Sequence, residues 1–166
     1  MENDLREFEQ IVRRVFLFSD ARATKEKALH PFDERNIYSR LPTVVKKLFD
    51  DGHYAQSTFE AFKFVDNEIQ RLSGLTESGF KLMMQALPET SPLVKLTPCS
   101  TVSEKDEQKG YQFLFAGSIL AIRNPRGHVS ISDSPDICLD HLSLASILLR
   151  RLESAGFKIK SPATGV

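Results

Sequence analysis

The sequence contains no tryptophan, three tyrosines and two cysteines among its 166 residues. The absence of tryptophan and the scarcity of tyrosine argue against an aromatic stacking platform for single-stranded nucleic acid. Cys99 and Cys138 lie far apart and form no CxxC pair, so neither a structural zinc site nor a disulfide framework is expected. Metal-ligand spacings and Gly-rich phosphate loops are also missing. We therefore expect no metal and no cofactor.

Net charge is the second thing that the chain lacks. Lysine plus arginine number 22 and aspartate plus glutamate number 22, which gives a formal net charge of zero. This balance argues against a broadly basic surface that coats nucleic acid, but it permits a small basic site. The first ten residues are charged and show no signal-peptide pattern, and no apolar run approaches the roughly 20 residues of a membrane span. We expect a cytoplasmic protein without a membrane partner.

Helical periodicity dominates what the chain does contain. Apolar residues recur every three or four positions, and no stretch sustains an alternation of apolar and polar residues. The pattern predicts an all-α helical bundle. Helices of the main domain are expected over residues 41–50, 53–72, 78–86, 111–123 and 137–154.

The segments outside these helices suggest a main domain with an appendage. Residues 1–35 are expected to form an N-terminal helix, over Asn3 to Phe18, and a polar linker, and residues 36–160 the helical domain. Residues 87–108 contain three prolines and a charged run and are predicted to be a long loop. Residues 129–131 are expected to be briefly extended, and residues 157–160 to be a short edge strand or a tail.

The segment Arg123-Asn124-Pro125-Arg126-Gly127-His128 points most specifically to a function. It follows the apolar stretch 111–122, which is predicted to be a buried helix, and Pro125 is expected to kink or end that helix. Arginine suits phosphate, and histidine transfers protons near neutral pH. Together they suit metal-independent cleavage of a phosphodiester, for which RNA supplies its own 2′-hydroxyl nucleophile. The alternative is an arginine that caps a helix end beside an ordinary loop histidine.

This segment and its context resemble the HEPN superfamily, small all-α domains whose signature is Arg-x(4 to 6)-His. Arg123, Asn124 and His128 match that signature, and Leu48 to Gln56 resembles one bacterial and phage HEPN group. The likeness covers roughly residues 37–155. It implies a bundle of four to five helices and a homodimer whose two Arg–His motifs share one cleft.

The resemblance also implies an activity, that of an endoribonuclease leaving a 2′,3′-cyclic phosphate. Such proteins act as toxins or effectors in antiviral defence and abortive infection, and an antitoxin or regulatory protein is a possible partner. The alternative that the family offers is a non-catalytic module that binds a nucleotide or a partner protein.

Site residues follow from the signature. His128 is expected to transfer the proton, Arg123 to stabilise the scissile phosphate, and Asn124 to orient the substrate or the histidine. Arg126 inside the signature, together with Glu60 and Lys63 on one face of the 53–72 helix, are candidate substrate-binding residues. His53 is expected only to help start its helix.

Overall fold

A computed structural model describes Phe8 and residues 29–160, and the chain divides into two units, Met1–His30 and Pro31–Val166. Apart from Phe8, the predicted N-terminal helix lies outside the described residues. The second unit begins a few residues before the predicted boundary. Its first element is a short helix, α2 (Pro31–Glu34), in a segment predicted to be linker. Proline is favoured at a helix start because its fixed φ suits the first turn.

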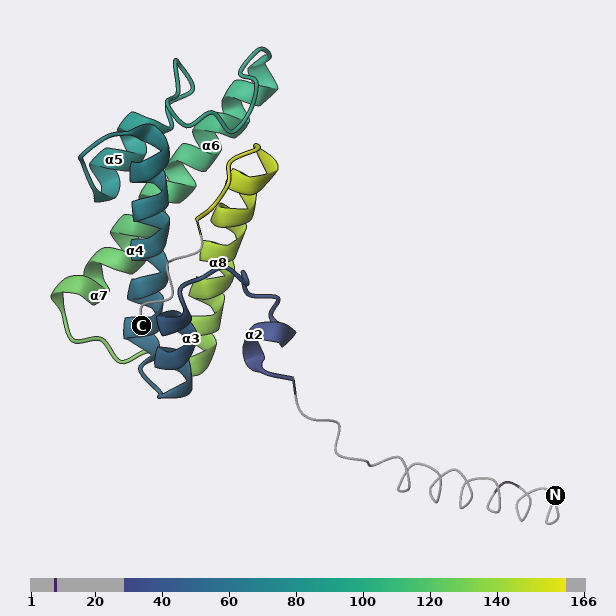
Figure 1. Cartoon of the computed structure of the whole chain (residues 1–166), viewed down its shortest axis with the longest axis vertical. Coiled ribbons are helices and arrows are strands. Elements are labelled where there is room, and N and C mark those ends of the chain that lie inside the picture. Colours follow the sequence, from purple (N-terminus) through teal and green to yellow (C-terminus); the bar gives the residue numbers. More distant parts are fainter. Residues whose placement is uncertain (1–7, 9–28, 161–166) are drawn as a thin grey trace. The chain divides into compact units, whose positions relative to one another are not determined.

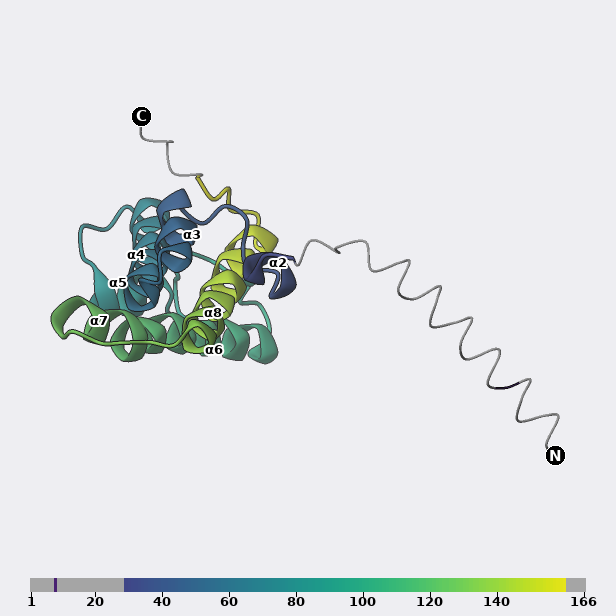
Figure 2. The same cartoon turned by 90° about the horizontal axis from the view of Figure 1, so that it is seen from below.

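The second unit is an all-α bundle, as predicted, and residues 29–160 contain no β-strand. Helix α4 lies at its centre and packs against α3, α5 and α8 (Figures 1 and 2). The helices that build the bundle are α3 (Thr43–Asp50), α4 (Tyr54–Ser73), α5 (Gly79–Ala86), α6 (Val102–Ser118) and α8 (Pro135–Ser154).

The core forms where the apolar stripes of these helices meet, at the three- and four-residue spacing that the sequence shows. On α4 the side chains of Phe62, Val65 and Ile69 are fully buried, and on α8 those of Leu142 and Leu149. Burial of each such side chain stabilises the fold by about 1.5–3 kcal/mol. The bundle therefore holds α4 rigidly, and α4 in turn supports the site described below.

The helix that leads to the Arg123–His128 segment does not end at Pro125. After α6 the chain makes one wide π-helical turn, η1 (Ile119–Arg123), and continues as α7 (Asn124–His128). The Asn124 backbone N–H bonds to the carbonyl of Ile119, five residues back. Since a wide turn changes the hydrogen-bond register ahead of a proline, Pro125 is accommodated without the predicted break.

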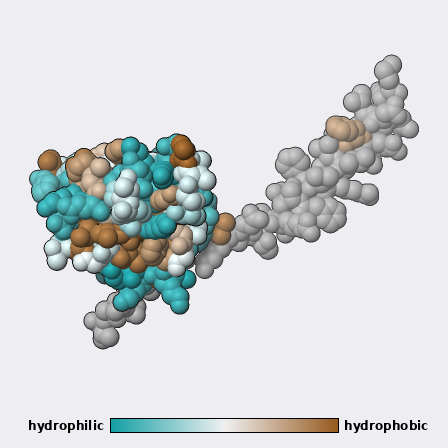
Figure 3. All heavy atoms as spheres, turned by 90° about the horizontal axis from the view of Figure 1, so that it is seen from above, coloured by the Kyte–Doolittle hydropathy of each residue, from teal (hydrophilic) through white to brown (hydrophobic). Residues whose placement is uncertain are grey.

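The predicted burial of this helix is only partly correct. Phe113, Leu114 and Leu120 are 54%, 49% and 48% exposed, whereas Phe115 and Ile119 are fully buried. One side of α6 therefore packs on the bundle, while the other presents apolar side chains to the surface. Apolar residues also reach the face seen in Figure 3, where brown atoms gather between teal ones.

Helix α6 begins at Val102, within the segment predicted to be a loop. A capping box starts it: the Thr101 hydroxyl accepts the Glu104 backbone N–H, and the Glu104 carboxylate accepts the Thr101 backbone N–H. These two bonds satisfy donors that the first helical turn would otherwise leave unpaired. The charged run after Thr101 is therefore the exposed start of a helix.

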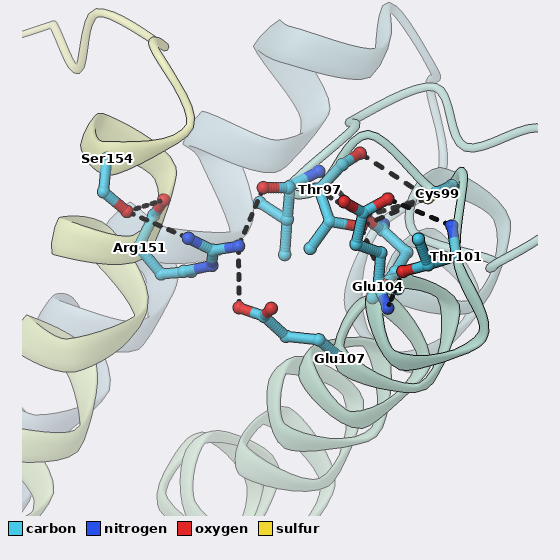
Figure 4. Close-up of polar contacts among 9 residues, drawn as sticks. Thr97, Cys99, Thr101, Glu104, Glu107, Arg151 and Ser154 are labelled. Atoms are coloured by element: carbon cyan, nitrogen blue, oxygen red, sulfur yellow. Dashed lines mark hydrogen bonds and ion pairs between the residues drawn. The ribbon is translucent and has the colours of Figure 1, made fainter.

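The remaining loop, residues 87–101, is fastened to α8 by Arg151 (Figure 4). The Nη2 of Arg151 donates to the carbonyl of Leu96 at 2.8 Å and lies 2.8 Å from the Glu107 carboxylate. Its guanidinium carbon also lies 5.2 Å from the centroid of the Tyr111 ring. Arg151 of α8 thus contacts both the loop, at Leu96, and α6, at Glu107 and Tyr111.

The C-terminal end of the described chain is a bound tail without strand structure. Arg71 of α4 donates to the carbonyl of Lys158 at 2.8 Å, and the Glu68 carboxylate accepts the Lys160 backbone N–H at 3.3 Å. Arg71 and Glu68 also pair with each other at 2.6 Å. Residues 129–131 likewise form no strand and belong to the connection between α7 and α8.

Candidate active site

Arg123 is half-buried at the end of η1, and most of its hydrogen-bonding capacity is unused. Its guanidinium carbon lies 5.4 Å from the centroid of the Phe59 ring, a cation–π arrangement. Its Nη1 donates to Oδ1 of Asn124 at 3.2 Å, and its Nε is buried without a partner in the described part of the chain. Since a guanidinium carries five N–H donors, this side chain is equipped to bind an anion.

The Arg123 charge acts on the carboxyl group of Asp66, which is buried on α4. It accepts the backbone N–H of Gly79 at 2.7 Å. Burial raises the pKa of Asp66, against the lowering effects of this N–H group and of the Arg123 charge. The raised pKa weakens Asp66 as a permanent counter-ion. Among the described residues Arg123 has no ion pair within 4.0 Å, so its charge is not neutralised by direct contact.

Asn124 and His128 follow on α7. The Asn124 side chain accepts a hydrogen bond from Arg123. Asn124 was predicted to orient the substrate or the histidine, but in the structure its side chain orients the arginine. His128 is the last residue of α7 and is exposed to solvent. Its imidazole makes no hydrogen bond or ion pair with any residue that the structure describes. It is therefore available to a substrate.

His128 lines a cleft of about 580 Å³ between the start of α4 and the connection from α7 to α8. Residues 52–56 form one wall and residues 126–133 the other. His53 belongs to the first wall, so the structure brings two histidines to one cleft. Arg123 and Asn124 are not among its lining residues. The sequence-predicted set is therefore divided: His128 faces the cleft, and Arg123 lies beside Phe59.

Arg126, predicted to contact a phosphate, directs three of its N–H groups to partners within the chain. Its Nε and Nη2 donate to the two carboxylate oxygens of Asp133 at 2.6 and 2.8 Å, and its Nη1 donates to the carbonyl of Ile122 at 2.8 Å. The Arg126 and Asp133 side chains are 8% and 4% exposed. Burial and the Arg126 charge together lower the pKa of the neighbouring His141. The Arg126–Asp133 pair thus links the two ends of the segment 126–133, which includes His128.

Glu60 and Lys63 lie on α4 but outside the lining of the cleft. They form an ion pair with each other at 3.2 Å, with side chains 21% and 48% exposed. Gln56, which does line the cleft, donates to the Glu60 carboxylate at 3.4 Å. Their predicted contact with a substrate remains a prediction, and the structure links them to the cleft only through Gln56.

Gly127 is packed against the aromatic ring that supports Arg123. A Cβ atom at this position would lie 2.9 Å from Cε2 of Phe59, closer than carbon atoms approach without displacement. The ring of Phe59 thus occupies the space that a side chain at position 127 would need. We expect Gly127→Ala to displace the ring and to lower the free energy of unfolding by about 1 kcal/mol, because overpacking outweighs the helix propensity of alanine.

Thermal unfolding of this variant beside Gly110→Ala measures the effect. Gly110 is also helical and exposed, but a Cβ atom there meets nothing within 4 Å. We expect Gly110→Ala to raise the free energy of unfolding by about 0.5–1 kcal/mol. Equal gains in the two variants would show that the Phe59 ring yields without resistance.

Further classes of site are limited by the composition of the described residues. They contain no group of three or more His, Cys, Asp or Glu side chains that could hold a metal ion. The helices among them are all too short or too polar to cross a bilayer. Cys138 is buried on α8, where burial raises the pKa of its thiol, and this disfavours the thiolate that a cysteine nucleophile needs.

Comparisons with known proteins yield one match. A search of curated proteins and a search of solved structures find no match for the chain. The model of a family described as "Protein of unknown function (Hypoth_ymh)" matches residues 35–152. This span is more than two thirds of the chain and includes both walls of the cleft and the Arg123–His128 segment. The chain therefore belongs to the Hypoth_ymh family.

Proposed function

We propose that the protein is a metal-independent endoribonuclease of the HEPN type that acts as a homodimer. The observation that carries the proposal is the state of two side chains on one continuous helical segment. Arg123 is half-buried and makes a single hydrogen bond, and His128 is exposed and unpaired in the described residues. A partly desolvated cation and an available imidazole are what phosphodiester cleavage without a metal requires.

In the proposed reaction the 2′-hydroxyl of RNA attacks the adjacent phosphorus. The bond from the 2′-oxygen to phosphorus forms as the bond to the 5′-oxygen breaks, which leaves a 2′,3′-cyclic phosphate and a 5′-hydroxyl. One group accepts the proton of the 2′-hydroxyl, and another donates a proton to the departing 5′-oxygen. His128 supplies one of these transfers, and Arg123 stabilises the charge on the phosphoryl oxygens. Asn124 orients Arg123 through its hydrogen bond.

A second copy of the chain completes the site in this proposal. Residues five apart on a helix point about 140° away from each other, and Arg123 does not line the cleft that His128 lines. The two side chains of one chain therefore do not converge on one phosphate. In a two-fold dimer the Arg123 of each copy meets the cleft of the other.

The exposed side of α6 is the surface that we assign to this dimer. Phe113, Gly117 and Leu120 lie at helical spacing on it, and the stripe leads directly to Arg123. Because a two-fold axis brings the same surface of both copies together, an apolar stripe that adjoins the site is self-complementary. The biological setting, a cytoplasmic toxin or effector in antiviral defence with a restraining partner protein, is proposed from the HEPN resemblance alone.

Incubation with RNA in the presence of EDTA tests the activity. We expect wild-type protein to cleave and to leave 2′,3′-cyclic phosphate ends, and we expect His128→Ala and Arg123→Ala each to lower the rate by about 10²–10⁴-fold. Lys81→Ala is the control, since Lys81 is an exposed residue paired only with Glu77 in the described chain. Equal cleavage by all four proteins would indicate a contaminating nuclease. Binding of RNA without cleavage would instead indicate the non-catalytic module.

Mixing the two inactive variants tests the composite site. In a heterodimer of Arg123→Ala and His128→Ala, one of the two sites combines an intact Arg123 with an intact His128 from different chains. We expect the mixture to regain up to about one quarter of wild-type activity, since half of the dimers are mixed and half of their sites are intact. No recovery, with mixed dimers demonstrated by native mass spectrometry, would place both side chains in one chain.

A further inference from the structure

His53 lies in the turn between α3 and α4, where its backbone is fixed on both sides. Its N–H donates to the carbonyl of Leu48 at 2.8 Å, and its carbonyl accepts the N–H of Ser57 at 2.9 Å. It occupies the N-cap position of α4, yet its side chain does not cap the helix. The imidazole is exposed and makes no hydrogen bond or ion pair with the described residues. The backbone of His53 is thus fixed while its imidazole is free of hydrogen bonds to the described residues and accessible to a ligand.

His53 and His128 line the same cleft, one from the α3–α4 turn and the other from α7. The cleft is about 580 Å³ in volume, within the range of about 300–1,000 Å³ that small-molecule sites occupy. The His53 wall also contains the first residues of α4, Tyr54 to Gln56. Backbone N–H groups in the first turn of a helix have no intrahelical acceptor and favour an anion. A phosphate group between the walls therefore meets two imidazoles and a favourable backbone field.

The proposed reaction needs two proton transfers at opposite sides of phosphorus. The 2′-oxygen enters and the 5′-oxygen leaves in line, so a single imidazole cannot reach both oxygens in one step. The Arg123–His128 segment supplies one histidine per chain, His128. The second histidine that lines the cleft is His53, from the α3–α4 turn.

We propose that His53 is the general base of this cleft and His128 the general acid, an inference that rests on the proposed ribonuclease activity. His53 belongs to the α3–α4 turn and His128 to the end of α7, so the two imidazoles reach the cleft from different elements. One can therefore serve the entering 2′-oxygen and the other the departing 5′-oxygen.

The experiment compares His53→Asn and His128→Asn in the full-length dimer. Asparagine is a preferred N-cap residue, so His53→Asn keeps the start of α4 while it removes the proton-transfer group. Circular dichroism and thermal unfolding verify that both variants remain folded. We expect each variant to cleave RNA about 10²–10⁴-fold more slowly than wild type. A folded His53→Asn protein with wild-type activity would overturn the inference and leave the proposed function intact.

The pH profile and an activated substrate separate the two roles. Wild type is expected to show a bell-shaped pH–rate profile; His53→Asn loses the limb that rises from acid pH, and His128→Asn the limb that falls at alkaline pH. The probe is uridine 3′-(4-nitrophenyl phosphate), whose nitrophenolate leaves without a proton. It is expected to restore most of the rate of His128→Asn and little of that of His53→Asn. Restoration of His53→Asn instead would overturn the assignment.

Mixed dimers show whether the two histidines act within one chain. Both line one cleft of a single chain, so mixing His53→Asn with His128→Asn leaves a defect in each site, and no recovery is expected. Mixing His53→Asn with Arg123→Ala should regain up to about one quarter of wild-type activity, as is expected for Arg123→Ala mixed with His128→Ala. Recovery in the mixture of His53→Asn with His128→Asn would overturn the inference that the two histidines of one chain act together. Wild-type protein without any cleavage would remove the proposed function itself, a result distinct from all of these.

Discussion

Replacement of Gln108 by leucine is expected to lower the free energy of unfolding by about 4 kcal/mol. The Gln108 side chain is fully buried, and its Oε1 accepts the backbone N–H groups of Leu96 and Thr97 at 2.8 and 3.3 Å. Its Nε2 donates to the carbonyls of Leu87 and Val94, both at 3.1 Å. Leucine fills the space but leaves four backbone groups unpaired, at about 1–3 kcal/mol for each that remains buried.

Urea denaturation measures this loss, and Gln112→Leu is the matched control. Gln112 lies one helical turn further along α6, is 4% exposed, and makes one hydrogen bond, to the carbonyl of Met84 at 2.9 Å. Its replacement is expected to lower the free energy of unfolding by about 1–2 kcal/mol. Amide exchange should also accelerate at residues 94–97 in Gln108→Leu only. Similar losses in the two variants would show that the loop is held without Gln108.

Removal of Arg126 is expected to have an effect of similar size, because it leaves Asp133 buried without a counter-ion. The pair is bidentate, with side chains 8% and 4% exposed. Breaking such a buried pair from one side typically costs about 3–5 kcal/mol. We expect this loss for Arg126→Ala. RNA cleavage should fall as well, because the Arg126–Asp133 pair links the two ends of the segment that contains His128.

Two further variants distinguish a buried charge from lost packing. The double variant Arg126→Met/Asp133→Leu removes both charges and is expected to unfold within about 1 kcal/mol of wild type, because apolar side chains often replace a buried pair at little cost. Arg35→Ala breaks an exposed pair with Asp140, 3.0 Å apart, and should cost less than about 1 kcal/mol. Guanidinium chloride would screen these charges, so urea is the denaturant of choice. A double variant as unstable as Arg126→Ala would assign the loss to packing.

Much of the bundle could be predicted from periodicity, because α3, α4, α5 and α8 each bury one apolar stripe. The start of α6 was missed since its first turns are charged and exposed, although Thr101 and Glu104 stand at capping-box spacing and were a usable signal. The wide turn before Pro125 could not be predicted, because its hydrogen bonds depend on how the following segment packs. The exposed side chains of Phe113 and Leu114 show that an apolar run does not by itself indicate burial.

The site was predictable in part. Arg123 and His128 were identified from residue type and spacing, but their division between Phe59 and the cleft depends on the packing of α7 on α4. His53 and His128 line one cleft although they are distant in sequence, and only the folded chain shows this. The same holds for Arg126, since the path of the α7–α8 connection decides whether it meets Asp133 or a ligand.

The wide turn at Ile119–Arg123 has a consequence for the history of the chain and for alignments of its relatives. Such a turn is what a helix makes when it absorbs one inserted residue without opening a loop. A residue added to a regular helix that does not absorb it rotates everything beyond it by about 100°. Because the wide turn takes up the extra residue locally, a relative that is one residue shorter here would present its arginine on the same side of a regular α-helix. A gap placed at this turn would therefore leave the arginines of the two chains in equivalent positions.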